Sequence, residues 1–103
     1  MRALLKVSIP VESGNAAIEN GALEKTIQQF MAAYEPEAAY FTVEGGRRTA
    51  LFVLDVPDPS HMPQIGEPFF QNVGASIDLT PVMNAEELGR GLEALAAAQQ
   101  AAH

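Results

Sequence analysis

Four side chains capable of acid–base chemistry or hydrogen bonding are predicted to share one face of a β-sheet: Lys6, Tyr40, Asp55 and Asp78. If that face is buried, a lysine beside two carboxylates can titrate at shifted pH and act as a proton donor or acceptor. The tyrosine adds a hydroxyl that donates or accepts a hydrogen bond. The alternative is a structural network of ion pairs inside a protein interface, which is the more common arrangement.

The fifth candidate is Arg47, which directly follows Gly45-Gly46. Arginine is suited to bidentate capture of a carboxylate, so a small acidic ligand could bind beside Arg47 at the mouth of a cavity. The alternative is a cross-strand pair with Glu44, and surface pairs of this kind are common and contribute little to stability. His61 and His103 have no second ligand at a suitable spacing, so the sequence predicts neither a metal site nor a cofactor.

The composition indicates one acidic domain that spans residues 1–103. Its net charge is −7, with six lysine and arginine residues. Binding to nucleic acids or to anionic membranes requires clustered cations, so the sequence argues against both partners. No apolar stretch approaches the roughly 20 residues of a membrane-spanning helix, and residues 1–10 lack the pattern of a signal peptide. The chain contains no cysteine, which excludes disulfides and suits the reducing cytoplasm.

The candidate residues depend on a β-hairpin predicted over residues 36–56. Gly45-Gly46 separates two segments of strand-like residues and supplies the positive φ angles of a two-residue hairpin loop. This loop sets a register in which Glu44 faces Arg47 and Phe41 faces Ala50. Phe41 then belongs to the core face of the hairpin, whereas Tyr40, Arg47 and Asp55 belong to the opposite, mixed face.

The other elements follow from periodicity and from helix-breaking residues. Alternation predicts strands over residues 3–10 and 75–82, and an apolar stripe predicts a helix over 15–34 after a loop at 11–14. Asn20-Gly21 interrupts that helix near its start. Pro68 is expected to split the next helix into pieces at 62–66 and 68–72, with Met62 on its buried side. A capping box of Asn84 and Glu87 opens a final helix that runs to about residue 98 and depends on docking.

The element order predicts an α+β, ferredoxin-like βαββαβ fold with an additional C-terminal helix. In this fold the antiparallel sheet has strand order 4-1-3-2, and both main helices cover one face. The other face carries the candidate residues together with Leu4, Leu51, Val53 and Val82. It is too apolar to remain bare in water and too polar for an ordinary core. We therefore expect a second copy to cover it, giving a homodimer.

Six motifs give the chain a resemblance to a known family. They are VSIPVE (residues 7–12), GN (14–15), PEAAYF (36–41), GRRT (46–49), EPFF (67–70) and PVMN (81–84). On these, nearly the whole chain resembles a group of small bacterial proteins in the dimeric α+β barrel superfamily. The resemblance implies a barrel formed by two chains, but the group has no assigned activity to transfer. The superfamily includes cofactor-free monooxygenases, haem-degrading enzymes and muconolactone-isomerase-like proteins.

Two classes of function remain open from the sequence. One is a dimeric module that binds a small molecule or has a structural role. The other is a cofactor-independent enzyme, similar to the monooxygenases or isomerases, that acts on a small, partly apolar substrate inside the barrel. The chain has no tryptophan and no histidine in a predicted strand, so it departs from the haem-degrading pattern. The expected ligand site is the barrel interior or its mouth, lined by Lys6, Tyr40, Arg47, Asp55 and Asp78.

Overall fold

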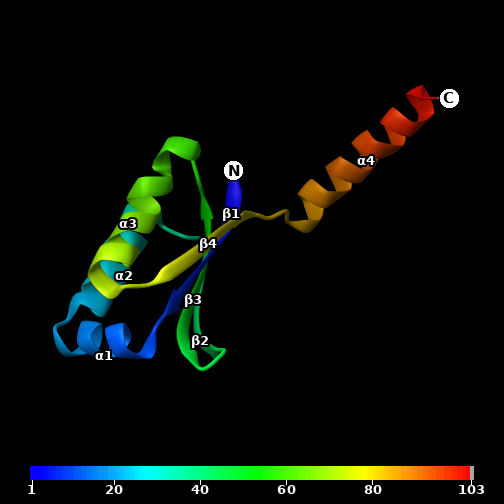
Figure 1. Cartoon of the computed structure of the whole chain (residues 1–103). Helices are drawn as coiled ribbons and strands as arrows, with labels where there is room; N and C mark the ends of the chain where they lie inside the picture. The colour runs from blue at the N-terminus through cyan, green and yellow to red at the C-terminus, as the bar shows by residue number, and fades with distance from the viewer. Residues whose placement is uncertain (103) are drawn as a thin grey trace.

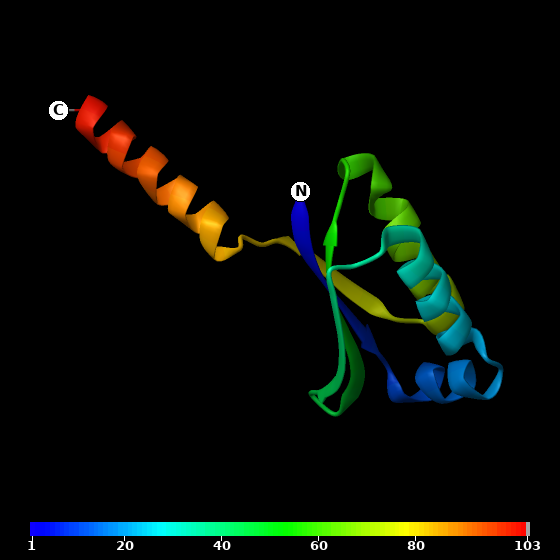
Figure 2. The same cartoon turned by 180° about the vertical axis from the view of Figure 1, so that it is seen from behind.

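A computed structural model describes residues 1–102 of the chain; His103, weighed above as a ligand, lies outside this range. Its elements follow in chain order: β1 (Arg2–Ile9), α1 (Val11–Glu19), α2 (Ala22–Tyr34), β2 (Ala38–Glu44), β3 (Arg47–Asp55), a 3₁₀ turn (Pro59–His61), α3 (Met62–Val73), β4 (Ser76–Pro81) and α4 (Ala85–Ala101). Helices α1, α2 and α3 form one layer on one side of the sheet (Figure 1). Helix α4 projects on the other side, and Figure 2 shows the same from behind.

The sheet has four strands in the order β2-β3-β1-β4, and every neighbouring pair is antiparallel. Counted from the opposite edge, the same order is β4-β1-β3-β2. The α+β class and the antiparallel sheet predicted from the sequence are confirmed, and they are compatible with a ferredoxin-like fold. The pairing of two such sheets into a barrel stays a prediction.

The hairpin of β2 and β3 has the predicted register. Glu44 lies opposite Arg47, and Phe41 lies opposite Ala50. The loop glycines have φ angles of 61° at Gly45 and 76° at Gly46, in the left-handed region that the tight turn requires. Local turn chemistry therefore sets which side chains of this hairpin face the helices.

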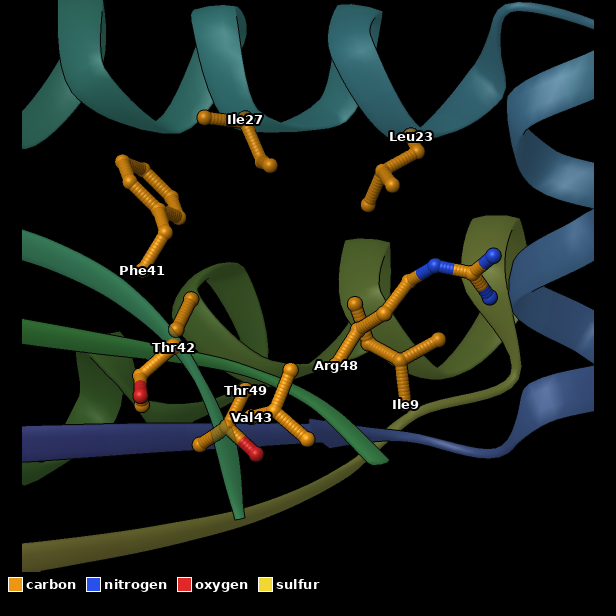
Figure 3. A pocket seen from close by; sticks show the side chains of 9 residues that line it. Ile9, Leu23, Ile27, Phe41, Thr42, Val43, Arg48 and Thr49 are labelled. Atoms are coloured by element: carbon orange, nitrogen blue, oxygen red, sulfur yellow. The ribbon is translucent and has the colours of Figure 1, made fainter. Parts of the chain in front are cut away.

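The core lies between the sheet and the layer of α1–α3. Leu5, Val7 and Ile9 of β1 are buried, as the alternation predicts, and the Phe30 and Phe52 rings pack with centroids 4.7 Å apart. Phe41 departs from the prediction that the helices cover it, because 59% of its surface is exposed. It lies on β2, the strand at the sheet edge, where α2 does not fully cover the sheet (Figure 3).

The first helical region begins earlier than predicted. The segment 11–14 was expected to be a loop, but α1 starts at Val11, immediately after Pro10. The Pro10 carbonyl accepts a 2.8 Å bond from the Gly14 amide, so proline acts here as the residue that precedes the first helical turn. The interruption predicted at Asn20-Gly21 is confirmed, since α1 ends there and α2 begins at Ala22.

Helix α3 is continuous, so the prediction of two separate pieces is wrong. It runs from Met62 to Val73 with Pro68 inside it. Proline removes one helical hydrogen bond, but Ile65, Phe69 and Val73 of the same helix are almost fully buried. Burial of these three side chains outweighs the local cost of the proline. Met62, expected on the buried side, is 52% exposed.

We predict that Pro68→Ala stabilises the protein. Proline inside a helix costs roughly 3 kcal/mol. Proline also restricts the unfolded chain, which offsets this cost by about 0.4–1 kcal/mol, so we expect a net gain of about 2–2.6 kcal/mol in urea unfolding. Pro63 lies in the first turn of α3, where a missing N–H is tolerated, and Pro63→Ala is the matched control with no expected gain. Equal effects of the two substitutions would contradict this account of α3.

Helix α4 opens with the predicted capping box. The Asn84 side chain accepts from the Glu87 amide at 2.8 Å, and the Glu87 carboxylate accepts from the Asn84 amide at 3.0 Å. The helix continues to Ala101, beyond the predicted end near residue 98. It extends away from the rest of the chain (Figure 1), which gives the molecule a longest dimension of 62 Å. The predicted docking of this helix is therefore not satisfied within one chain.

Candidate functional site

The sheet has one face that the layer of α1–α3 does not cover, and we call it the open face (Figure 1). Arg2, Leu4, Lys6 and Ser8 of β1 alternate with the buried residues of that strand and are half-buried. Leu51 and Val53 of β3 are also half-buried there. The alternation of each strand thus gives this face a partly apolar centre, as the sequence predicts.

Three of the five candidate residues lie in one row across the open face. Tyr40 on β2 pairs with Leu51 on β3, Leu51 pairs with Lys6 on β1, and Lys6 pairs with Asp78 on β4. The row therefore presents a phenol, an apolar side chain, an ammonium group and a carboxylate on neighbouring strands, which lie about 4.8 Å apart. We call these four residues the central row. In a single chain, Tyr40 is 67% exposed.

Lys6 bonds to a carboxylate that the sequence did not assign to it. Its Nζ lies 2.6 Å from Oε1 of Glu44, the last residue of β2. Lys6 does not bond to Asp78, its neighbour in the central row. The hydrogen bond and the charge of Glu44 raise the pKa of Lys6, and the charge of Asp78 raises it further. Lys6 consequently remains a cation throughout the neutral range and can donate a hydrogen bond to an acceptor.

The remaining two candidates lie at opposite ends of β3. Asp55 accepts a 2.7 Å hydrogen bond from the Met1 ammonium group. Arg47 lies next to the hairpin loop, opposite Glu44 in the register, although the Glu44 carboxylate binds Lys6. Eight residues separate Asp55 from Arg47, a distance of about 26 Å along an extended strand. These two side chains cannot contact the same small molecule within one chain.

Arg2 is a charged residue of the open face that the sequence reasoning missed. Its guanidinium group forms ion pairs with Glu37, just before β2, and with Glu87 in the first turn of α4. Strand alternation from Lys6 back to Arg2 was the signal that could have identified it, but the predicted strand began at residue 3. Arg2 therefore connects the first turn of α4 to the open face of the sheet through an ion pair.

A groove lies on the helix side of the β2 edge, and we call it the edge groove (Figure 3). The groove has a volume of about 370 Å³. Leu23 and Ile27 of α2 face Phe41 and Val43 of β2 across it. A neighbouring hollow of about 400 Å³ shares Leu23, Ile27 and Phe41. Arg48 closes one end of the groove and donates a 2.9 Å hydrogen bond to the Asn15 side chain. The groove was not predicted from the sequence, because Phe41 was expected to be covered by the helices.

Neither a metal centre nor a membrane span is found in residues 1–102. No three histidine, cysteine or carboxylate side chains within this range lie close enough together to hold a metal ion. None of the helices in the same range has the length and apolar character required to cross a membrane. No protein-family model and no curated protein sequence matches the chain.

Proposed function

We propose that the chain forms a homodimer in which two open faces pack together as a dimeric α+β barrel. The barrel binds a small, partly apolar molecule between the two sheets. The central row supports this proposal most directly, because a phenol, an ammonium group and a carboxylate lie in one row across a face that α1–α3 leave uncovered (Figure 1). The proposed location is the cytoplasm, which suits a chain without cysteine.

The composition of the open face supports a ligand site rather than a dry core. Binding sites for small molecules combine an apolar lining with a few polar groups that fix the orientation of the ligand. Leu4, Leu51 and Val53 supply the lining, and the central row supplies two hydrogen-bond donors and an acceptor. A second open face encloses these groups and excludes water, which strengthens their hydrogen bonds to a ligand.

The alternative proposal is a cofactor-independent enzyme that acts on a small substrate in the same barrel. Proton abstraction or attack by an amine requires a lysine that is neutral near pH 7. The Glu44 hydrogen bond shifts the pKa of Lys6 upward, in the opposite direction. Lys6 is therefore suited to hold an acidic or carbonyl-bearing ligand, and the upward shift of its pKa favours the binding module over the enzyme.

Thermal shift screening of small acids, phenols and quinones tests the ligand proposal. A ligand at 100 times its Kd stabilises the wild type by about 2.7 kcal/mol. Tyr40→Phe removes a hydrogen bond and Asp78→Asn removes the negative charge of an acceptor, and each is expected to weaken binding by about 0.5–1.5 kcal/mol.

Tyr34→Phe is the matched control, because the Tyr34 hydroxyl bonds to His61 and Gln64 on the helix side. It should leave the ligand-induced shift unchanged. A shift that survives both Tyr40→Phe and Asp78→Asn at full size would show that the ligand binds elsewhere.

A further inference from the structure

Helix α4 carries three exposed leucines on one side. Leu88, Leu92 and Leu95 are 46%, 55% and 52% exposed, and we call this side the leucine face. Ala85 precedes these leucines on the same side of the helix. From Ala85 to Leu88, Leu92 and Leu95 the spacings are three, four and three residues, as in the apolar seam of paired helices. Three charged residues of this helix, Glu86, Arg90 and Glu93, lie on the opposite side, and the fourth, Glu87, lies beside the leucine face in the first turn. This pattern is typical of a helix that packs against another apolar surface over its first three turns.

Packing is also what a helix of this composition requires. It has 17 residues and contains Gly89 and Gly91, which disfavour helical structure. Most helical stability in proteins comes from the tertiary packing of an apolar face rather than from helix propensity. The contacts that hold α4 to its own chain include the capping box and the Arg2–Glu87 ion pair, both at its first turn.

The leucine face cannot reach the edge groove of its own chain. The groove contacts Ile9 and Val43, at the hairpin end of the sheet. Helix α4 leaves from the other end, where Arg2 holds Glu87. These ends of β1 are seven residues apart, about 23 Å along the strand, and α4 points away from the hairpin (Figure 1). Each chain therefore contains an apolar helix face and an apolar groove that cannot meet within it.

A second copy on the open face brings the two features together. Helix α4 projects on the open-face side of the sheet, so it extends toward a copy that covers this face (Figure 2). If the two-fold axis runs across the strands, the Arg2 end of one sheet lies over the hairpin end of the other. Seventeen helical residues span about 26 Å, which exceeds the distance of about 15 Å between the outer strands of a four-stranded sheet.

The area of the open face also indicates that a stable dimer needs a further contact. Four strands of six to nine residues have a footprint of about 500 Å² per copy, or about 1,000 Å² for both. Obligate homodimers bury about 2,000 Å² or more in total. Two helices of this length, each packed in a groove, supply the missing area.

We propose that α4 is an exchanged arm, whose leucine face docks in the edge groove of a second copy of this chain. Leu92 and Leu95 pack against Leu23, Ile27 and Phe41 of the other copy. This proposal rests on the face-to-face dimer proposed above, because that dimer sets the direction in which α4 reaches its partner. The arm adds to the barrel a second contact that lies outside the two open faces.

Sedimentation of single variants at micromolar concentration separates the arm from the barrel. Leu92→Asp places a charge on the leucine face and is expected to convert a dimer into 11.0 kDa monomers. Ala94→Asp adds the same charge to α4 away from the leucine face and should leave the dimer intact. Val53→Asp places a charge on the open face and therefore tests the barrel interface instead.

The combined outcomes distinguish the two proposals. Dissociation by Val53→Asp but not by Leu92→Asp overturns the arm and leaves the barrel standing. The reverse result overturns the barrel and supports an interface formed by α4. A wild-type mass of 11.0 kDa overturns both.

Cross-linking between two differently substituted copies identifies what the arm contacts. The chain has no cysteine, so Leu95→Cys in one copy and Phe41→Cys in another provide unique thiols. A short bis-maleimide is expected to join these two proteins when they are mixed, and Glu93→Cys in place of Leu95→Cys should give several-fold less product. Efficient linking of Leu95→Cys to itself would show that two α4 helices pair with each other, and would overturn docking in the groove.

Discussion

Replacement of Phe52 by alanine is expected to lower the free energy of unfolding by about 3–5 kcal/mol, the usual cost of removing a buried phenylalanine. Phe52 is fully buried on β3, and its ring contacts Phe30, Phe41 and Phe69 with centroid distances of 4.7, 5.8 and 6.3 Å. Its removal opens a cavity at the point where the sheet meets α2 and α3. Because domains of this size are stable by about 5–15 kcal/mol, the loss is a large part of the total.

Urea unfolding measures this loss at one fixed protein concentration, since the stability of a dimer depends on concentration. The matched control is Phe70→Ala, because Phe70 lies on α3 next to Phe69 but is 45% exposed. It should cost less than about half as much. A loss below about 1.5 kcal/mol for Phe52→Ala would contradict the core described here.

Val53→Asp is expected to abolish the proposed dimer. Val53 lies between Leu4 and Ala38 in the partly apolar centre of the open face. The substitution leaves an unpaired carboxylate in the interface, at a cost of roughly 3–5 kcal/mol, and a two-fold interface contains it twice. Because each 1.4 kcal/mol changes the dissociation constant about tenfold, the constant should rise more than about a thousandfold.

Sedimentation equilibrium checks this result, with an expected mass of one 11.0 kDa chain. Val11→Asp is the control, since Val11 is 52% exposed at the start of α1, on the helix side of the sheet (Figure 1). A helix N-terminus also accepts a carboxylate without loss. A Val53→Asp protein that stays dimeric while folded would mean that the open face is not the interface.

The strands and their faces were predictable because local rules determine them. Gly45-Gly46 demands a two-residue turn, and that turn alone places Phe41 opposite Ala50 and Glu44 opposite Arg47. The capping box of Asn84 and Glu87 is equally local. In each case, residues a few positions apart specify the geometry without help from the rest of the chain.

The errors arose where distant residues decide the outcome. Helix α3 continues through Pro68 because Ile65 and Phe69 are buried against elements far away in the sequence. Phe41 was assigned to the core because alternation gives the face of a strand but not the extent of the helix above it.

The sequence predicted which candidate residues share a face of the sheet, but not which of them bond to one another. Alternation placed Tyr40, Lys6 and Asp78 on one face, and strand pairing brings them into one row. A lysine side chain is long enough to bypass its row neighbour, so Lys6 binds Glu44 rather than Asp78. Register predicts neighbours in the sheet, whereas the bonds of long side chains depend on their rotamers.

The central place of β1 has a consequence for the order in which the chain can fold. β1 pairs on one edge with β3 and on the other with β4, so Lys6 meets Asp78 across 72 residues of chain. During synthesis, the hairpin of β2 and β3 can form early, while β1 keeps one unpaired edge until β4 has left the ribosome. Such edges promote aggregation. A chain cut short before Ser76 thus exposes the middle of its own sheet, which makes completion of β4 the step that protects the nascent protein.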